Sequence, residues 1–171
     1  DEVEIWIGLD VGKEDHFADV LDDDGESLFA RSVANNEADL VAVIERASKH
    51  GTPGLVIDQP GSIAQLAIAV ANQHEVPVAY VPGLVMRRAA DLYPGESKTD
   101  RRDAFVIADT GRTRRRSIHW LDAGNDELLE QLGIQVRVQH DRHPVLLVHV
   151  PAREHVVVRR DEAGHELRLR L

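Results

Sequence analysis

Apolar runs and amphipathic stretches alternate along the first part of the chain, and the period of the pattern changes several times. Residues 4–11 are mostly apolar and predict a buried strand, while 15–22 alternate between polar and apolar side chains. The acidic, glycine-containing segment 23–26 predicts a tight turn, so we expect 27–33 to return as a third, antiparallel strand. The chain thus opens with a predicted three-stranded meander.

Helical periodicity begins after this meander and then alternates with further strands. The pattern predicts helices from Asn35 or Asn36 to about His50, from Gly61 to Glu75 and from Gly83 to about Leu92, and strands at 54–58 and 77–81. A polar loop at 93–98 precedes a last helix, which begins near Thr99. Three antiparallel strands followed by helix–strand units predict the α/β fold class, with a central five-stranded mixed sheet.

Four carboxylates stand at the ends of these predicted elements. Asp10 and Asp58 each end an apolar run, and Asp100 and Asp103 lie three residues apart at the start of the last helix. Carboxyl ends of strands meet at one edge of an open α/β sheet, and residues three apart share a helix face. Carboxylate oxygens are ligands that Mg²⁺ prefers. The four acids are therefore candidates for a metal site for phosphodiester cleavage or transfer.

Three of these acids, and also Lys13, have a second interpretation in which they take no part in catalysis or metal binding. Asp10 can end a strand and accept backbone hydrogen bonds, Asp100 can stabilise a helix N-terminus, and Asp103 can pair with nearby arginines. Lys13, three residues after Asp10, can contact a phosphate near the site or be a solvated lysine. Both interpretations stay open at this point for every one of these residues.

The segments around the acids resemble a known family. They read Ile-Gly-Leu-Asp-Val-Gly-Lys at 7–13, Val-Ile-Asp-Gln-Pro-Gly at 56–61 and Lys-Thr-Asp-Arg-Arg-Asp-Ala-Phe-Val-Ile-Ala-Asp at 98–109. These segments are similar to the N-terminal domain of DEDD-type insertion-sequence transposases of the IS-one-ten family. That domain resembles the Holliday-junction resolvase RuvC, and the order of elements is likewise ribonuclease H-like. The resemblance covers about residues 3–132.

The resemblance implies a DNA transposase or recombinase domain in which the four acids hold Mg²⁺ or Mn²⁺ and carry the catalysis. Asp58 departs from the family, which usually has Glu at this position. Members act on DNA, are expected to be homo-oligomers, and include enzymes guided by a structured RNA. They also carry a C-terminal domain with a serine nucleophile, and its motif is absent here, so we expect an incomplete copy.

The charge distribution adds a candidate nucleic-acid surface. The net charge is −10, but residues 1–86 hold 16 acidic and 4 basic side chains, whereas 87–116 hold 9 basic and 5 acidic ones. A basic stretch beside carboxylates can bind phosphates, although a solvated helical face has the same composition. The candidate nucleic-acid-binding residues are Lys13, Arg87, Arg88, Lys98, Arg101, Arg102, Arg114, Arg115 and Arg116.

The composition is typical of a soluble protein with one main domain. Apolar residues make up 43% and charged residues 29% of the 171 residues. No apolar run approaches the roughly 20 residues of a membrane span, and no signal-peptide pattern is present. The absence of cysteine excludes disulfides and thiolate metal sites. We therefore expect a cytoplasmic protein without a membrane partner, and the family resemblance implies that the cytoplasm is bacterial.

Residues 133–171 differ from the rest of the chain. They are rich in Val and Arg and hold five of the nine histidines, which lack metal-ligand spacing. Two interpretations are open: translation in a shifted frame after about Leu132, or a small β appendage with a turn at 161–164. We accordingly expect a RuvC-like domain at 3–132 and an atypical tail at 133–171.

Different classes of function remain open. The first is the metal-dependent catalytic domain of a DNA transposase. The second is a non-catalytic nucleic-acid-binding module of the same fold, and the third is a free-standing RuvC-like nuclease that uses two metal ions. The sequence alone does not decide whether this chain is an active enzyme.

Overall fold

The computed structural model describes most of the first 121 residues and four short strands beyond them. The described residues are 2–59, 61–90 and 99–121, together with four strands at 135–138, 146–149, 156–160 and 166–170. The chain divides into two units, Asp1–Asp122 and Ala123–Leu171. The predicted loop at 93–98, including Lys98, lies outside the described residues. None of the described helices is long and apolar enough to cross a membrane.

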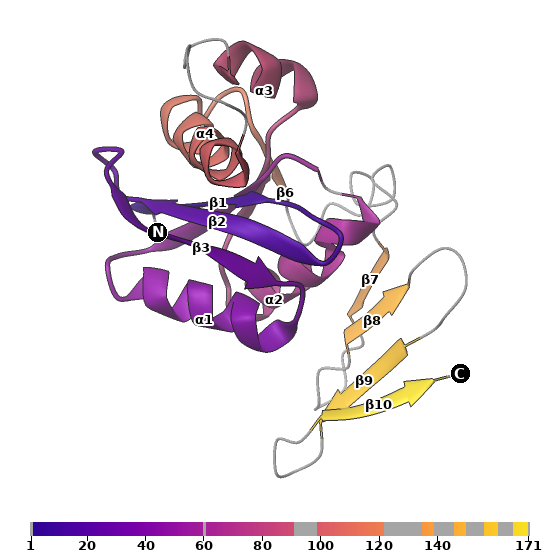
Figure 1. The fold of residues 1–171 in the computed structure, drawn as a ribbon. Coiled ribbons are helices and arrows are strands. Elements are labelled where there is room, and N and C mark those ends of the chain that lie inside the picture. The colour runs from indigo at the N-terminus through magenta and orange to yellow at the C-terminus, as the bar shows by residue number, and fades with distance from the viewer. Residues whose placement is uncertain are drawn as a thin grey trace. The chain divides into compact units, whose positions relative to one another are not determined.

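A six-stranded mixed sheet forms the centre of the first unit, in the order β3-β2-β1-β4-β5-β6 (Figure 1). Its strands are β1 (Ile5–Asp10), β2 (Asp15–Leu21), β3 (Ser27–Ala34), β4 (Pro53–Ile57), β5 (Val78–Tyr80) and β6 (His119–Leu121). β1, β4 and β5 are parallel, and the other pairs are antiparallel. The predicted α/β class and mixed sheet are confirmed, but the predicted count of five strands is wrong. β6, with three residues, is too short to show a period.

Helices cover both faces of this sheet. α1 (Glu37–Ser48) and α2 (Gln65–Gln73) lie on one face, and α3 (Gly83–Ala90) and α4 (Asp100–Thr113) on the other (Figure 1). α1 begins at the predicted cap, because the Asn36 side chain accepts a hydrogen bond from the Asp39 amide at 2.9 Å. The helix predicted from Gly61 to Glu75 is divided into a short 3₁₀ turn, η1 (Ser62–Ala64), and α2.

α4 packs very closely on the sheet at two glycines. A Cβ atom on Gly8 of β1 would lie 2.7 Å from the Cβ of Ala108 in α4. A Cβ atom on Gly111 of α4 would lie 2.6 Å from Val56 of β4 and 3.1 Å from the Trp6 ring. Trp6 is fully buried beside this contact. Glycine at both positions therefore lets the helix backbone approach the strands.

The second unit contains two antiparallel pairs of strands. β7 (Gln135–Val138) pairs with β8 (Leu146–His149), and β9 (Val156–Arg160) pairs with β10 (Glu166–Arg170). The predicted turn at 161–164 lies outside the described residues. The division at 132, and the shifted frame or β appendage beyond it, stay predictions.

Candidate functional site

The carboxyl ends of β1 and β4 bring the first two acids to one edge and one face of the sheet. Leu9 and Ile57 are partners in the parallel ladder, so Asp10 and Asp58 occupy the next position on neighbouring strands. Side chains alternate along a strand, which puts Asp10 on the same face as Gly8, and Asp58 on the same face as Val56. The contacts at Gly8 and Val56 identify this face as the one that α4 covers.

The direction of α4 brings the second pair of acids to the same edge. Ala108 packs against Gly8 in the middle of β1, while Gly111 packs against Trp6 near the start of that strand. α4 therefore runs antiparallel to β1, with its N-terminus over the carboxyl ends of the strands. Thr99 caps this end, because its Oγ1 accepts a hydrogen bond from the Arg102 amide at 3.2 Å.

Asp58 and Asp103 are electrostatic neighbours at this edge. Burial raises the pKa of the Asp58 carboxyl above its ordinary value, and the charge of Asp103 raises it further. Hydrogen bonds, including one from the Val11 backbone amide, oppose these effects. Oδ1 of Asp58 is buried without a hydrogen-bond partner among the described residues. A cation bound here would relieve both the repulsion and the unsatisfied oxygen.

Asp58 and Asp103 can serve as two ligands of a hard divalent cation, but they do not form a complete set of protein ligands. In the described part of the chain, no group of three or more Asp, Glu or His side chains is placed to hold a metal ion together. Mg²⁺, however, is commonly bound by one or two protein carboxylates, with waters and substrate phosphates as its other ligands. Asp58 and Asp103 fit this mode. Asp10 is half-buried at the same edge, and Asp100 is exposed in the first turn of α4.

The structure separates six of the predicted nucleic-acid-binding residues into two groups. Lys13 is exposed in the turn after β1, and Arg101 and Arg102 lie in the first turn of α4, so these three are near the acids. By contrast, Arg114 and the two arginines after it follow the C-terminal end of α4. Because α4 is antiparallel to β1, that end lies at the opposite edge of the sheet.

Arginines at the C-terminal end of α4 make intramolecular ion pairs. Arg115 contacts Glu2 at 2.7 Å and Asp23 at 3.1 Å, and its guanidinium lies 4.9 Å from the centre of the Trp6 ring. Arg112, in the last turn of α4, pairs with Asp109 at 2.7 Å. These two guanidinium groups bind the protein itself, which makes them weaker candidates for phosphate contacts.

Sequence reasoning assigned no role to His16, whose buried ring holds the turn that follows Asp10. The Gly12 amide donates to Nδ1 at 3.1 Å, which requires the neutral ring, and Nε2 then donates to Oδ1 of Asn35 at 3.1 Å. Burial lowers the pKa of His16, against the opposing effects of Asn35, Gly12 and Asp15. This turn carries Lys13. The only sequence signal was a polar residue inside a strand.

Asp19 is a second buried polar residue that the sequence did not single out. It is 1% exposed, and it pairs with Gly8 in the β1–β2 ladder, so it shares the face covered by α4. Burial raises the pKa of its carboxyl, while a hydrogen bond from Ser27 and the charge of Arg101 oppose the rise. The positive charge of Arg101, in the first turn of α4, thus favours the ionised form of Asp19.

This combination of sheet order, late helix and acid-lined edge defines the ribonuclease H-like class of proteins. The structure is similar to that of Thermus thermophilus RuvC, solved in complex with a Holliday junction substrate, with a TM-score of 0.52 and 14% sequence identity. The similarity covers 69% of this chain and 99% of the RuvC chain. The predicted RuvC-like fold is thus confirmed.

The family follows from the sequence comparison. The family model of the DEDD transposases of IS110, described as a transposase, matches residues 7–143. The chain belongs to this family, and the resemblance inferred from the segments around the acids is confirmed.

Similar proteins come from insertion elements of Streptomyces and Mycobacterium. The 43.6 kDa protein of insertion element IS110 from Streptomyces coelicolor is 42% identical over 142 residues, and the 42 kDa protein of IS900 from Mycobacterium paratuberculosis is 37% identical over 146 residues. These alignments cover 82% and 84% of this chain and 35% of each relative. The chain thus spans about a third of the length of these relatives.

Proposed function

We propose that residues 2–121 form the metal-dependent domain of a DNA transposase, with phosphodiester chemistry at the edge where β1 and β4 end. The observation that carries this proposal is the half-buried Asp58 carboxylate, whose buried Oδ1 has no hydrogen-bond partner among the described residues and whose charge is repelled by that of Asp103. Asp10 and Asp100 belong to the same edge and complete the proposed catalytic and metal-binding set. The family to which the chain belongs supports this reading.

Asp58 and Asp103 would hold Mg²⁺ or Mn²⁺ directly, with Asp10 and Asp100 as further ligands or as ligands of bound water. A divalent ion at such a site polarises a phosphodiester and neutralises the charge that develops on its oxygens. The protein's own part is to keep the carboxylates aligned, since α4 is held against β1 at Gly8. The Lys13 side chain is close enough in sequence to Asp10 to contact a neighbouring phosphate.

DNA is the proposed substrate. It is the ligand of the RuvC structure that has the same fold, and transposition is a reaction of DNA. A structured guide RNA, a homo-oligomeric assembly and a cytoplasmic location are further expectations from the family resemblance. A serine nucleophile, if the reaction uses one, is not assigned to any residue of this chain.

A second candidate function is a nucleic-acid-binding module without turnover. The specific observation in its favour is that no described group of three acidic or histidine side chains is placed to hold a metal ion. In this case the chain would bind nucleic acid through its basic side chains, and the carboxylates would not support cleavage. A free-standing RuvC-like nuclease is the third possibility, and it would cut branched DNA.

DNA nicking and DNA binding together test the proposal. The wild-type chain is incubated with supercoiled plasmid and with a four-way junction in Mn²⁺, Mg²⁺ or EDTA, and compared with Asp58→Asn and Asp103→Asn. We expect metal-dependent nicking that both variants lose, whereas Glu45→Gln on the outer surface of α1 keeps it. Binding without nicking in any metal would favour the non-catalytic module, and preferential cutting of the junction would favour the nuclease.

A further inference from the structure

The outer face of α3 combines one exposed apolar side chain with two positive charges. Leu84 is 60% exposed, the larger of two such exposures among large hydrophobic residues in the described part of the chain. Arg87 and Arg88 follow at i+3 and i+4, and both are exposed. Residues at these spacings share one face of a helix. Leu84 therefore lies beside two guanidinium groups on the same surface.

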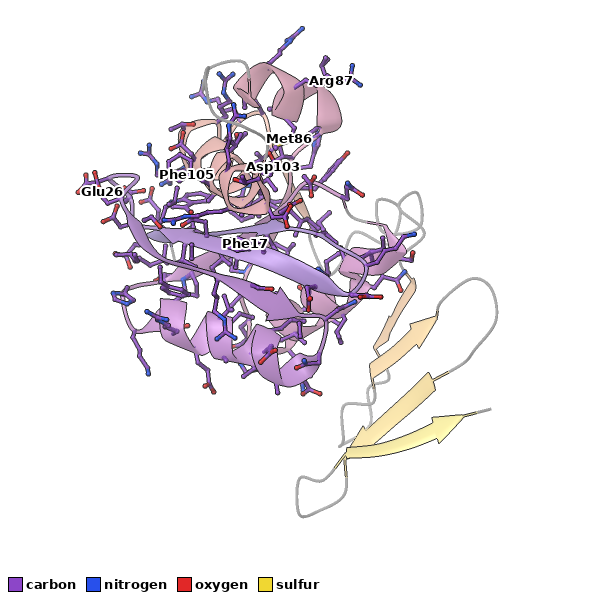
Figure 2. All side chains as sticks on the ribbon, viewed as in Figure 1. Phe17, Glu26, Met86, Arg87, Asp103 and Phe105 are labelled. Carbon is purple, nitrogen blue, oxygen red and sulfur yellow. The ribbon has the colours of Figure 1, made fainter. Side chains whose placement is uncertain are left out.

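The opposite face of α3 fixes this orientation. Val85 and Met86 pack against the main hydrophobic cluster, and Ala89 is buried. Figure 2 shows Arg87 extending from α3 on the side away from the sheet, while Met86 lies on the side of α4. The exposure of Leu84 is thus a consequence of how the helix is anchored.

α3 begins at the same edge of the sheet as the carboxylates. It follows β5, whose carboxyl end lies beside that of β4, and the Val81 amide donates to the carbonyl of Ile57 at 2.8 Å. Ile57 immediately precedes Asp58. α3 also packs against α4, which carries Asp103. The face formed by Leu84, Arg87 and Arg88 therefore flanks the proposed active edge.

The arginines of the basic stretch differ in what they already bind. Arg112 and Arg115 are paired with carboxylates of the same chain. Among the described residues, no carboxylate forms an ion pair with Arg87 or Arg88. Two guanidinium groups on an exposed helix that pair with none of the described carboxylates are complementary to a polyanion.

We propose that Leu84, Arg87 and Arg88 form the surface on which α3 docks DNA next to the carboxylates. The two guanidinium groups contact backbone phosphates, and Leu84 packs on the apolar face of a sugar or base at the groove, as apolar wedges do in architectural DNA-binding proteins. This inference rests on the proposed function for its substrate. It makes α3, rather than the already paired Arg115, the main phosphate-binding element.

Salt-dependent binding separates the electrostatic and apolar parts of this surface. Fluorescence anisotropy with a labelled 30-base-pair duplex is measured from low to moderate salt, in EDTA so that no cleavage occurs. Because each phosphate contact contributes about 0.9 to the log–log slope, Arg87→Gln/Arg88→Gln should reduce its magnitude by about 2. The matched control, Arg31→Gln/Lys49→Gln, removes two charges from β3 and from the end of α1, and should leave the slope nearly unchanged.

Leu84→Ser tests the apolar contact. It should weaken binding about tenfold at every salt concentration without changing the slope, since it removes buried apolar surface and no charge. Leu84→Met should retain most of the affinity. A melting temperature within error of wild type shows that each variant is folded, which is expected because Leu84 is exposed.

The outcomes distinguish this inference from the proposed function. An unchanged slope in the arginine double variant, or no binding by wild type, overturns the docking surface even if nicking is observed. Unchanged affinity in Leu84→Ser overturns the apolar contact and points instead to another protein segment as the partner of Leu84. If the arginine double variant shows the predicted decrease in the salt-dependence slope but the wild-type protein never nicks DNA, the docking surface on α3 is supported. That result contradicts only the proposal of catalysis.

Discussion

Replacing Gly8 by alanine should separate α4 from β1 and disturb the acid pair without touching any carboxylate. The new Cβ would lie 2.5 Å from the Ala108 amide nitrogen and 2.7 Å from the Ala108 Cβ, and would also overlap the carbonyl oxygen of Ala104. These neighbours are backbone atoms or a helix Cβ, so none can move away by changing rotamer. Because carbon atoms normally approach to about 3.5–4.0 Å, α4 must recede by about 1 Å.

The expected magnitude follows from this overlap. Overpacking of a close contact costs about 1–3 kcal/mol, and for a chain of this size each 1 kcal/mol lowers the melting temperature by about 2–4 °C. Gly8→Ala should therefore melt about 2–12 °C below wild type. The receding helix also carries Asp103 away from Asp58, so the variant should bind Mn²⁺ more weakly than its stability loss explains.

Thermal melting with and without millimolar Mn²⁺ measures both effects. Gly61→Ala is the matched control, because a Cβ at Gly61 would meet no atom within 4 Å and should leave both the melting temperature and the metal response unchanged. If Gly8→Ala melted like wild type, the close approach of α4 to β1 would be refuted. A destabilised variant with an unchanged metal response would refute the link between helix position and the acid pair.

Three further predictions concern single side chains. Asp58→Asn should raise the melting temperature without metal, because it removes a half-buried charge that Asp103 repels, and should lose the stabilisation by Mn²⁺; a retained metal response contradicts the site. Because the pKa of His16 is lowered in the folded protein, the unfolded chain binds a proton on this side chain at a higher pH than the folded chain does. The free energy of unfolding should therefore fall as the pH drops below 6.5, and His16→Gln should make this fall smaller between pH 7.5 and 5.5. An equal fall in wild type and variant would exclude His16 as its cause. Arg115→Gln should cost about 1 kcal/mol in chemical denaturation, and less at high salt, since its ion pairs are partly exposed; a loss independent of salt would assign the effect to packing on Trp6.

Much of this protein was predictable from local sequence patterns. The strands and helices of residues 4–90 have the periods and caps of their type, and the boundaries agree with the structure to within a few residues at most ends. The acids stand at the ends of these elements, where the topology rules for α/β sheets place functional groups. Such signals are carried by neighbours in the chain, so a single sequence contains them.

Other features depend on contacts that no local pattern encodes. β6 was missed because three residues have no measurable period and form a strand only through pairing with β5. His16 looked like an ordinary polar residue in a strand, and its role appears only when Asn35 and the Gly12 amide meet its ring.

The sequence by itself determined the family, the α/β class and the four candidate acids. Only the tertiary structure decided which arginine side chains are available to bind phosphate. Arg87 and Arg115 belong to the same basic stretch and are chemically identical. Arg115 is paired with Glu2, 113 positions away, while Arg87 lies exposed on α3. The difference arises because an ion pair requires proximity in space, and only folding brings residues so distant in sequence within hydrogen-bonding distance.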